Sequence, residues 1–269
     1  MSARFDYYAA SLDVPPGVIA DAILEKVPGA YGVRLGRGKN GYKQSMSVTD
    51  TDGEVMATIL HGGYNLMPHA YASGKDAPMF AQLIRDDWGG AHRVTRVDSC
   101  CDVQEDFHAA HPVLQQLARA RGLRGRSILP DDPEDGSSYY IGSPSSRVQV
   151  RVYEKGLEMR AKGHDVPDWY LGTLRFEVQL RPTKEGRVTA SAMTPEEVWG
   201  ATPWTREISV RHLGHDPGRN PTRLKLHTTF ERRSQVLVDQ HGHHLFQWAR
   251  KLGGWQQLGD EIERRLGIS

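Results

Sequence analysis

Three segments of the chain alternate apolar and polar residues with the two-residue period of a β-strand. They span residues 93–103, 147–154 and 172–180, and each would place its apolar residues on one face. The polar positions in and just after these segments are Arg96, Asp98, Cys100 and Asp102, then Arg147, Gln149, Arg151 and Tyr153, then Arg175, Glu177, Gln179 and Arg181. If the segments pair in one antiparallel sheet, these side chains gather on a single polar face.

The rest of the chain predicts further strands and several helices. The other expected strands are Phe5–Leu12, Tyr31–Leu35, Lys43–Thr49, Val55–His61 and Ser138–Gly142. The expected helices are Pro16 to about Pro28, Ala77–Trp88, Pro112–Ala120 and one starting at Thr194. We therefore expect an α+β fold, with a central, mainly antiparallel sheet flanked by helices over 1–190 and a mainly helical region over 191–269.

Composition is typical of a globular protein. The 269 residues are 38% hydrophobic and 25% charged, and no apolar run approaches the roughly 18 residues that span a bilayer. The two cysteines, Cys100 and Cys101, are adjacent and do not suggest a disulfide framework. The first residues, MSARFDYYAASLDV, lack the apolar run of a signal peptide. We expect a cytoplasmic protein that does not contact a membrane.

One short stretch is strongly basic although the net charge is only +1. The stretch contains Arg119, Arg121, Arg124 and Arg126 and no acidic residue. Such a cluster can match a phosphate backbone, but charge alone favours an ordinary solvated surface.

The expected polar face combines three kinds of chemistry. Asp98, Asp102 and Glu177 offer the oxygen ligands that Mg²⁺ and Mn²⁺ prefer. Arginines bind phosphate through two hydrogen bonds at once, and a tyrosine hydroxyl can act as a covalent nucleophile. Together these groups suit phosphodiester transfer. The alternative is a wetted sheet face whose arginines and acids form ordinary stabilising pairs across strands.

Four blocks in this region resemble known motifs in their order and spacing. They are Thr95–Asp102 (R-x-D-x-x-x-D), Tyr140–Ser146 (Y-x-G-S-x-x-S), Arg151–Glu158 (R-x-Y-[ED]-K-x-x-E) and Leu174–Leu180 (R-x-E followed by an apolar residue). All four resemble blocks of the plasmid and phage replication initiation factor family, whose members initiate rolling-circle replication. The resemblance covers roughly residues 30–185.

This resemblance implies a sheet that carries a DNA-nicking site. By matching position, Tyr153 would be the nucleophile, and Asp98, Asp102 and Glu177 would bind Mg²⁺ or Mn²⁺. Arg151 and Lys155 would bind or orient the phosphate. Tyr140, with Tyr139 beside it, is the alternative nucleophile.

The resemblance also implies partners. Single-stranded and duplex origin DNA would be bound with the help of Arg96, Arg147, Arg175 and the basic stretch 119–126. A host helicase and a host DNA polymerase would be further partners in the bacterial cytoplasm. A homodimer is compatible with this role. Whether the source is a phage or a plasmid stays open.

Two other functions remain compatible with the sequence. A non-catalytic origin-binding or regulatory protein would keep the fold, and a conjugative relaxase would share the chemistry. The run His241-Gly242-His243-His244 has enough imidazoles for a metal, but we interpret it as surface histidines. No role for the C-terminal third follows from the sequence.

Overall fold

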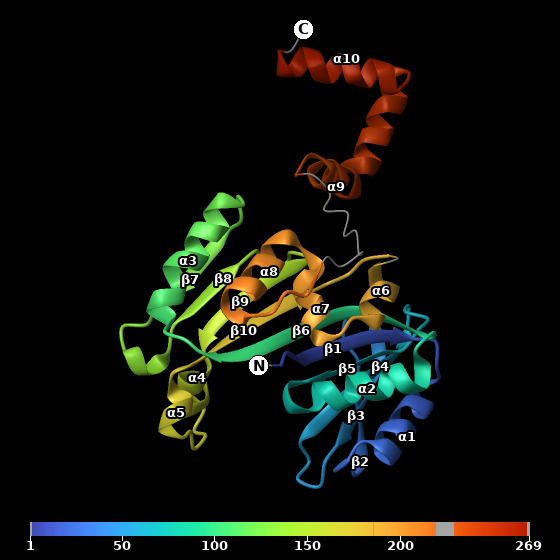
Figure 1. Cartoon of the computed structure of the whole chain (residues 1–269). Helices are drawn as coiled ribbons and strands as arrows, with labels where there is room; N and C mark the ends of the chain where they lie inside the picture. Colours follow the sequence, from blue (N-terminus) through green and yellow to red (C-terminus); the bar gives the residue numbers. More distant parts are fainter. Residues whose placement is uncertain (1, 185, 219–228, 268–269) are drawn as a thin grey trace. The chain divides into compact units, whose positions relative to one another are not determined.

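The structure is a computed structural model that describes residues 2–184, 186–218 and 229–267 (Figure 1). Contacts divide the chain into two compact units, Met1–Leu224 and Lys225–Ser269. Each unit is considered by itself.

The first unit is built on one ten-stranded sheet within the described residues, in the order β2-β3-β4-β5-β1-β6-β10-β9-β8-β7. All of its neighbouring strands are antiparallel. The strands are β1 (Arg4–Leu12), β2 (Gly32–Arg37), β3 (Tyr42–Thr49), β4 (Val55–Gly63), β5 (His69–Ser73), β6 (His92–Gln104), β7 (Gly125–Ile128), β8 (Ser138–Ile141), β9 (Val148–Glu154) and β10 (Thr173–Leu180). The expected α+β fold with an antiparallel sheet is confirmed.

Helices pack along the sheet and join its apolar side chains in one buried cluster (Figure 1). The helices of this unit are α1 (Pro16–Lys26), α2 (Ala77–Trp88), α3 (Phe107–Ala120), α4 (Lys155–Ala161), α5 (Asp168–Leu171), α6 (Gly186–Ala192), α7 (Pro195–Val198) and α8 (Pro203–Ile208). Short 3₁₀ turns lie at Gly74–Asp76, Pro133–Asp135 and Trp199–Ala201, and a π-helical turn spans Ser209–Leu213.

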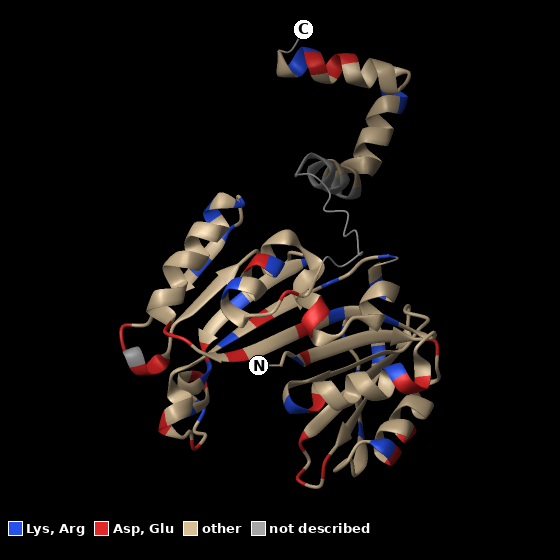
Figure 2. Cartoon of the chain, in the orientation of Figure 1, with Lys and Arg blue, Asp and Glu red and all other residues tan. Residues whose placement is uncertain are grey.

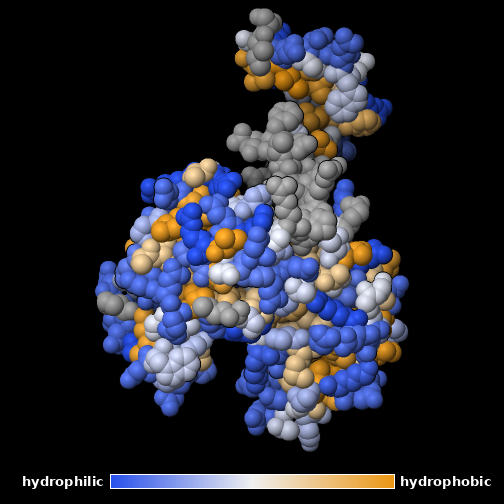
Figure 3. Space-filling view, in the orientation of Figure 1, coloured by the Kyte–Doolittle hydropathy of each residue, from blue (hydrophilic) through white to orange (hydrophobic). Residues whose placement is uncertain are grey.

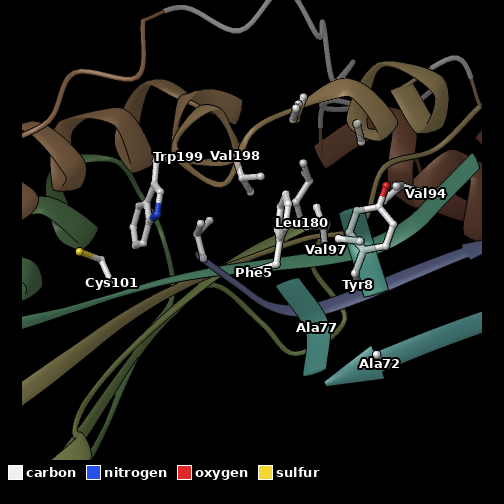
Figure 4. Close-up of a cluster of buried hydrophobic side chains, with 14 of the residues drawn as sticks. Phe5, Tyr8, Ala72, Ala77, Val94, Val97, Cys101, Leu180, Val198 and Trp199 are labelled. Atoms are coloured by element: carbon white, nitrogen blue, oxygen red, sulfur yellow. The ribbon is translucent and has the colours of Figure 1, made fainter. Parts of the chain in front are cut away.

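The core lies on the face that the sequence pattern marked as apolar. Val148, Val150 and Val152 of β9 are buried there, and so are the alternate apolar residues of β6 and β10. Trp199, which is fully buried, lies beside Val198 above this face (Figure 4). The polar residues that alternate with these apolar residues along β6, β9 and β10 therefore point to the opposite face of the sheet.

The structure adds elements that the pattern did not predict. Strand β5 alternates alanine with His69, Tyr71 and Ser73, and small alanines give a weak strand signal. Strand β7 has only four residues. Helix α3 begins at Phe107 rather than Pro112, because the Asp106 side chain accepts a hydrogen bond from the backbone N–H of His108 and caps it.

Helices α7 and α8, which follow residue 190, belong to the first unit. Helix α7 packs on β6 and β1, and its capping box at Thr194 is present as expected. The functional division at residue 190 stays a prediction.

The second unit contains α9 (Thr229–Leu252) and α10 (Trp255–Leu266), in agreement with the helical C-terminal region expected. His241, His243 and His244 are exposed on α9, and the ring of His243 shares a hydrogen bond with Gln247. Among the described residues, none of the helices combines the length and apolarity needed to cross a bilayer.

Candidate active site

Strand register brings the three polar segments together. Strand β10 lies between β6 and β9, and residues directly opposite each other point to the same side of a sheet. The resulting rows are Asp102–Arg175–Tyr153, Cys100–Glu177–Arg151 and Asp98–Gln179–Gln149. All three candidate carboxylates, the candidate nucleophile and two candidate arginines therefore share one polar face.

Arg151 links two buried carboxylates on this face. Its guanidinium forms an ion pair with Glu177, and its Nη2 lies 3.7 Å from Oδ2 of Asp98. The side chains of Glu177 and Asp98 are each only 1% exposed. Burial raises the pKa of Glu177 to about 7; the charge of Arg151 opposes this rise and that of Asp98 adds to it.

Asp102 has a different environment. Its Oδ1 accepts a hydrogen bond of 2.6 Å from Arg175 Nε, and its Oδ2 accepts bonds from Arg175 Nη2 (2.9 Å), Arg4 Nη2 (2.7 Å) and the Tyr170 hydroxyl (3.1 Å). Burial alone would raise the pKa of Asp102, but the hydrogen bonds from Arg175 and Arg4 outweigh it and bring the pKa to about 2. Asp102 is therefore an ionised anchor for two arginines.

Tyr153 lies near the end of β9, directly opposite Arg175. It is half-buried, and burial raises the pKa of its hydroxyl above the ordinary range while the charge of Arg175 opposes that rise. Lys155 Nζ lies 5.8 Å from the centre of the Tyr153 ring and forms a 2.6 Å ion pair with Glu158. Two cations thus flank the tyrosine.

Tyr140 lies on the same face, one strand further out. It is opposite Arg151 on β9 and opposite Arg126 on β7, whose guanidinium lies 5.2 Å from the centre of the Tyr140 ring. Tyr139 points the other way and is buried against His111, with ring centres 4.9 Å apart. A molecule bound on the polar face would therefore contact Tyr140 rather than Tyr139.

The remaining arginines are spread more widely. Arg96 Nε donates a 2.9 Å hydrogen bond to Oδ1 of Asp98, so it belongs to the polar face. Arg147 directly precedes β9. Arg119 is exposed in the last turn of α3, and Arg121 and Arg124 are exposed between α3 and β7. Arg121 pairs with Glu207 at 2.7 Å.

Three side chains of this site were missing from the sequence interpretation. Arg4 and Asp6 come from β1, and Asp6 Oδ1 accepts a 3.1 Å hydrogen bond from Arg175 Nη1. Tyr170 comes from α5. The polar alternation of Arg4 and Asp6 at the start of β1 was an available signal, but only the pairing of β1 with β6 shows where it leads.

The donor set can be tested for a divalent ion. Across the described ranges, no group of three or more His, Cys, Asp or Glu side chains is placed to hold a metal ion. Asp98 and Glu177 nevertheless both face one cation, the guanidinium of Arg151. Mg²⁺ often takes only one or two protein carboxylates and completes its shell with water and substrate phosphate. Asp98 and Glu177 are two such carboxylates, and the guanidinium of Arg151 lies between them in this structure.

Charged residues of both signs lie along the strands of the first unit (Figure 2). The space-filling view shows a notch in this unit between the part with α4 and α5 and the part with β2 and β3 (Figure 3). The surface beside this notch is predominantly hydrophilic (Figure 3).

The fold is similar to that of a solved rolling-circle replication initiator protein from Geobacillus stearothermophilus. The TM-score is 0.52, the identity is 18%, and the match covers 74% of this chain and 83% of that chain. No family model and no curated protein matches the chain. The comparison therefore rests on fold alone: this chain and that protein share a similar fold.

Proposed function

We propose that the protein initiates rolling-circle replication by nicking and rejoining an origin strand. The supporting observation is that Tyr153, three carboxylates and several arginines share one face of a sheet whose fold is similar to that of an initiator. A transferable phosphate needs a nucleophile and cations beside it, and this face offers both.

In the proposed reaction the Tyr153 oxygen attacks the scissile phosphorus. A bond forms between that oxygen and phosphorus, the bond to the 3′ oxygen of the preceding sugar breaks, and the 5′ end stays on the protein. The tyrosine proton passes to solvent water, and the departing 3′ oxygen takes up a proton from water to become a hydroxyl. The charges of Arg175 and Lys155 favour the phenolate and oppose the effect of burial on the pKa of Tyr153. The reverse attack by a 3′ hydroxyl rejoins the strand, so no nucleotide cofactor is needed.

We propose that Asp98 and Glu177 hold Mg²⁺ or Mn²⁺ when DNA is bound. Arg151 would then exchange its carboxylate partners for a phosphate oxygen, to which its planar guanidinium is well suited. The bound ion would polarise the phosphate. Asp102, the third expected ligand, would join only after releasing Arg4 and Arg175; until then it orients Arg175 beside Tyr153.

The test is covalent capture of DNA. The protein is incubated with a labelled single-stranded origin oligonucleotide and Mn²⁺ or Mg²⁺, then denatured and run on a gel. We expect a protein–DNA band that is lost with Tyr153→Phe and with EDTA, and kept with Tyr140→Phe. A band that survives Tyr153→Phe but not Tyr140→Phe would move the nucleophile to Tyr140.

A non-catalytic origin-binding protein is the second candidate. It is favoured by the fact that all three carboxylates form ion pairs with arginines. Such pairing is also expected of charges that only stabilise the sheet. Origin binding without any covalent band would support it. A conjugative relaxase would give the same band and would differ in the DNA sequence it selects.

The remaining partners follow from the proposed chemistry. The free 3′ hydroxyl would be extended by a host polymerase, and a host helicase would separate the strands in the bacterial cytoplasm. Arg96, Arg126 and Arg147 would contact the backbone near the cut, and the exposed Arg119, Arg121 and Arg124 would contact flanking duplex.

A further inference from the structure

Aromatic rings form a continuous row beside the candidate active site. The rings of Tyr7 on β1 and Tyr71 on β5 are stacked, with centres 5.8 Å apart and an interplanar angle of 17°. His69, two residues before Tyr71, continues the row at 6.2 Å, and Tyr42 stacks on His69 at 6.2 Å. The rings come from β1, β5 and β3, and β4 lies between β5 and β3 in the sheet.

This row lies on the same sheet face as the candidate active site. Tyr7 is directly opposite Asp98, and Tyr71 is opposite Ala9, which is opposite Arg96. Small residues such as Ala9 leave room for rings on this face, and helix α2 packs β1 and β5 through their apolar residues on the other. The four rings of the row are only half-buried, so part of each ring is open to solvent.

Two cations accompany the rings. The guanidinium of Arg96 lies 4.2 Å from the centre of the Tyr7 ring, and Lys39 Nζ lies 5.0 Å from that of Tyr71. Arg34 continues the same register row through Ser47 and Thr58, which is opposite Tyr71. Burial, with Arg187 and Lys39, lowers the pKa of His69, so its ring is neutral near pH 7.

Rings that alternate with cations suit a single nucleic acid strand. Each base presents a flat face that stacks on an aromatic ring, and each phosphate attracts a cation. A duplex hides its base faces, and an acidic peptide lacks them. Arg96 belongs to both regions, because it pairs with Asp98 and lies over Tyr7.

We propose that Tyr7, Tyr71 and His69, with Arg96 and Lys39, form a stacking track for the part of the single strand that flanks the cut. This rests on the proposed strand-transfer function and adds a second region of strand recognition to it. Tyr7 lies three strands and two register rows from Tyr153, which corresponds to about 20 Å. The track therefore binds bases several nucleotides from the scissile phosphate.

The first experiment measures equilibrium binding of fluorescent oligodeoxynucleotides in EDTA, so that the strand stays intact. The strands carry the nick site and are extended on the 5′ side, the 3′ side or neither. We expect extension on one side to tighten binding to the wild type, and Tyr71→Ala to lose that gain, about tenfold in Kd. The matched control is Tyr31→Ala, which removes a tyrosine that is 75% exposed and directly precedes β2.

Two further variants separate stacking from folding. Tyr71→Phe keeps the ring and is expected to bind like the wild type, whereas Tyr71→Leu keeps an apolar side chain and is expected to bind like Tyr71→Ala. Thermal unfolding shows whether each variant is folded. If a Tyr71 variant does not fold, Lys39→Ala tests the same track by removing the cation beside Tyr71. A 2-aminopurine base in the flank should be quenched by the wild type and by Tyr71→Phe only.

The outcomes distinguish the two proposals. Equal affinity of the wild type and Tyr71→Ala for every extended strand overturns the track, whatever the covalent assay gives. A Tyr71→Phe variant as weak as Tyr71→Ala also overturns it, because stacking would then not be the cause. Absence of a covalent band from the wild type overturns strand transfer. The comparison of binding affinities still tests the stacking track in that case.

Discussion

Arg151 and Glu177 lie directly opposite each other on β9 and β10 and form an ion pair that also reaches Asp98. A cation of the protein thus occupies the position between two buried carboxylates. A divalent ion would compete for the carboxylates and a phosphate for the guanidinium. Binding of both at once would exchange one set of charge pairs for another and leave no buried charge without a partner.

The raised pKa of Glu177 predicts a pH dependence of stability. Its pKa is about 7 in the folded protein and 4.5 in the unfolded chain, so the folded state binds the extra proton between these values. The protonated Glu177 therefore contributes to the free energy of unfolding. This contribution is fully present below pH 4.5 and is lost as the pH rises through 7, by up to about 3 kcal/mol. Glu177→Gln should flatten this decline, as measured by urea unfolding from pH 4 to 8.

The matched control is Glu25→Gln, which changes an exposed glutamate on α1. It should leave the pH profile of the wild type intact. An identical decline in Glu177→Gln would assign the pH dependence to other groups.

Arg175→Lys should weaken the anchor around Asp102. Lysine cannot make the two parallel hydrogen bonds that Arg175 makes to this carboxylate, so we expect a loss of about 2 kcal/mol in the free energy of unfolding at pH 7. Because the folded pKa of Asp102 is about 2, the difference from the wild type should shrink as the pH falls from 4 to 2. Chemical denaturation at several pH values checks this.

Gly156→Ala should disturb α5 and with it Tyr170. A Cβ at Gly156 would lie 2.2 Å from the carbonyl oxygen of Tyr170 and 2.5 Å from Cα of Leu171, so backbone must shift. We expect a loss of about 2 kcal/mol or more in the free energy of unfolding. Gly17→Ala in α1, where the new Cβ meets nothing within 4 Å, should instead stabilise by up to about 1 kcal/mol. Equal effects of the two changes would contradict the close approach at Gly156.

The adjacent thiols should be unreactive in the folded protein. Cys100 and Cys101 are both buried, and burial raises the pKa of Cys100 to about 12, so little thiolate forms at pH 8. We expect a reagent that modifies solvent-exposed thiols to label neither cysteine in the native protein and both after denaturation. Rapid native labelling, read by mass spectrometry, would show that the centre of β6 opens to solvent.

The faces of β6, β9 and β10 could be predicted from the sequence because a strand repeats every two residues. The same period places Asp98, Arg151 and Glu177 on polar positions without any knowledge of neighbours. Which strands are adjacent was an assumption, since periodicity carries no information on pairing. The register supplies it and shows that the arginines and carboxylates neutralise one another.

Other features were out of reach of the pattern. Asp6 and Tyr7 are consecutive, yet both contribute to the polar face because β1 has an irregularity between Phe5 and Tyr7. Strand β5 is recognised only through its partners β1 and β4, which bring Tyr71 to Tyr7. Long-range pairing, rather than local propensity, decides both.

The two outermost strands of the sheet, β2 and β7, end a long ladder of backbone hydrogen bonds. Unpaired strand edges invite pairing with other chains, and exposed charged side chains discourage it. Arg34 and Arg37 are exposed on β2, and Arg126 is exposed on β7. These arginines would keep such a broad sheet from assembling edge to edge into fibres, so the protein can present an extended surface and still remain dispersed.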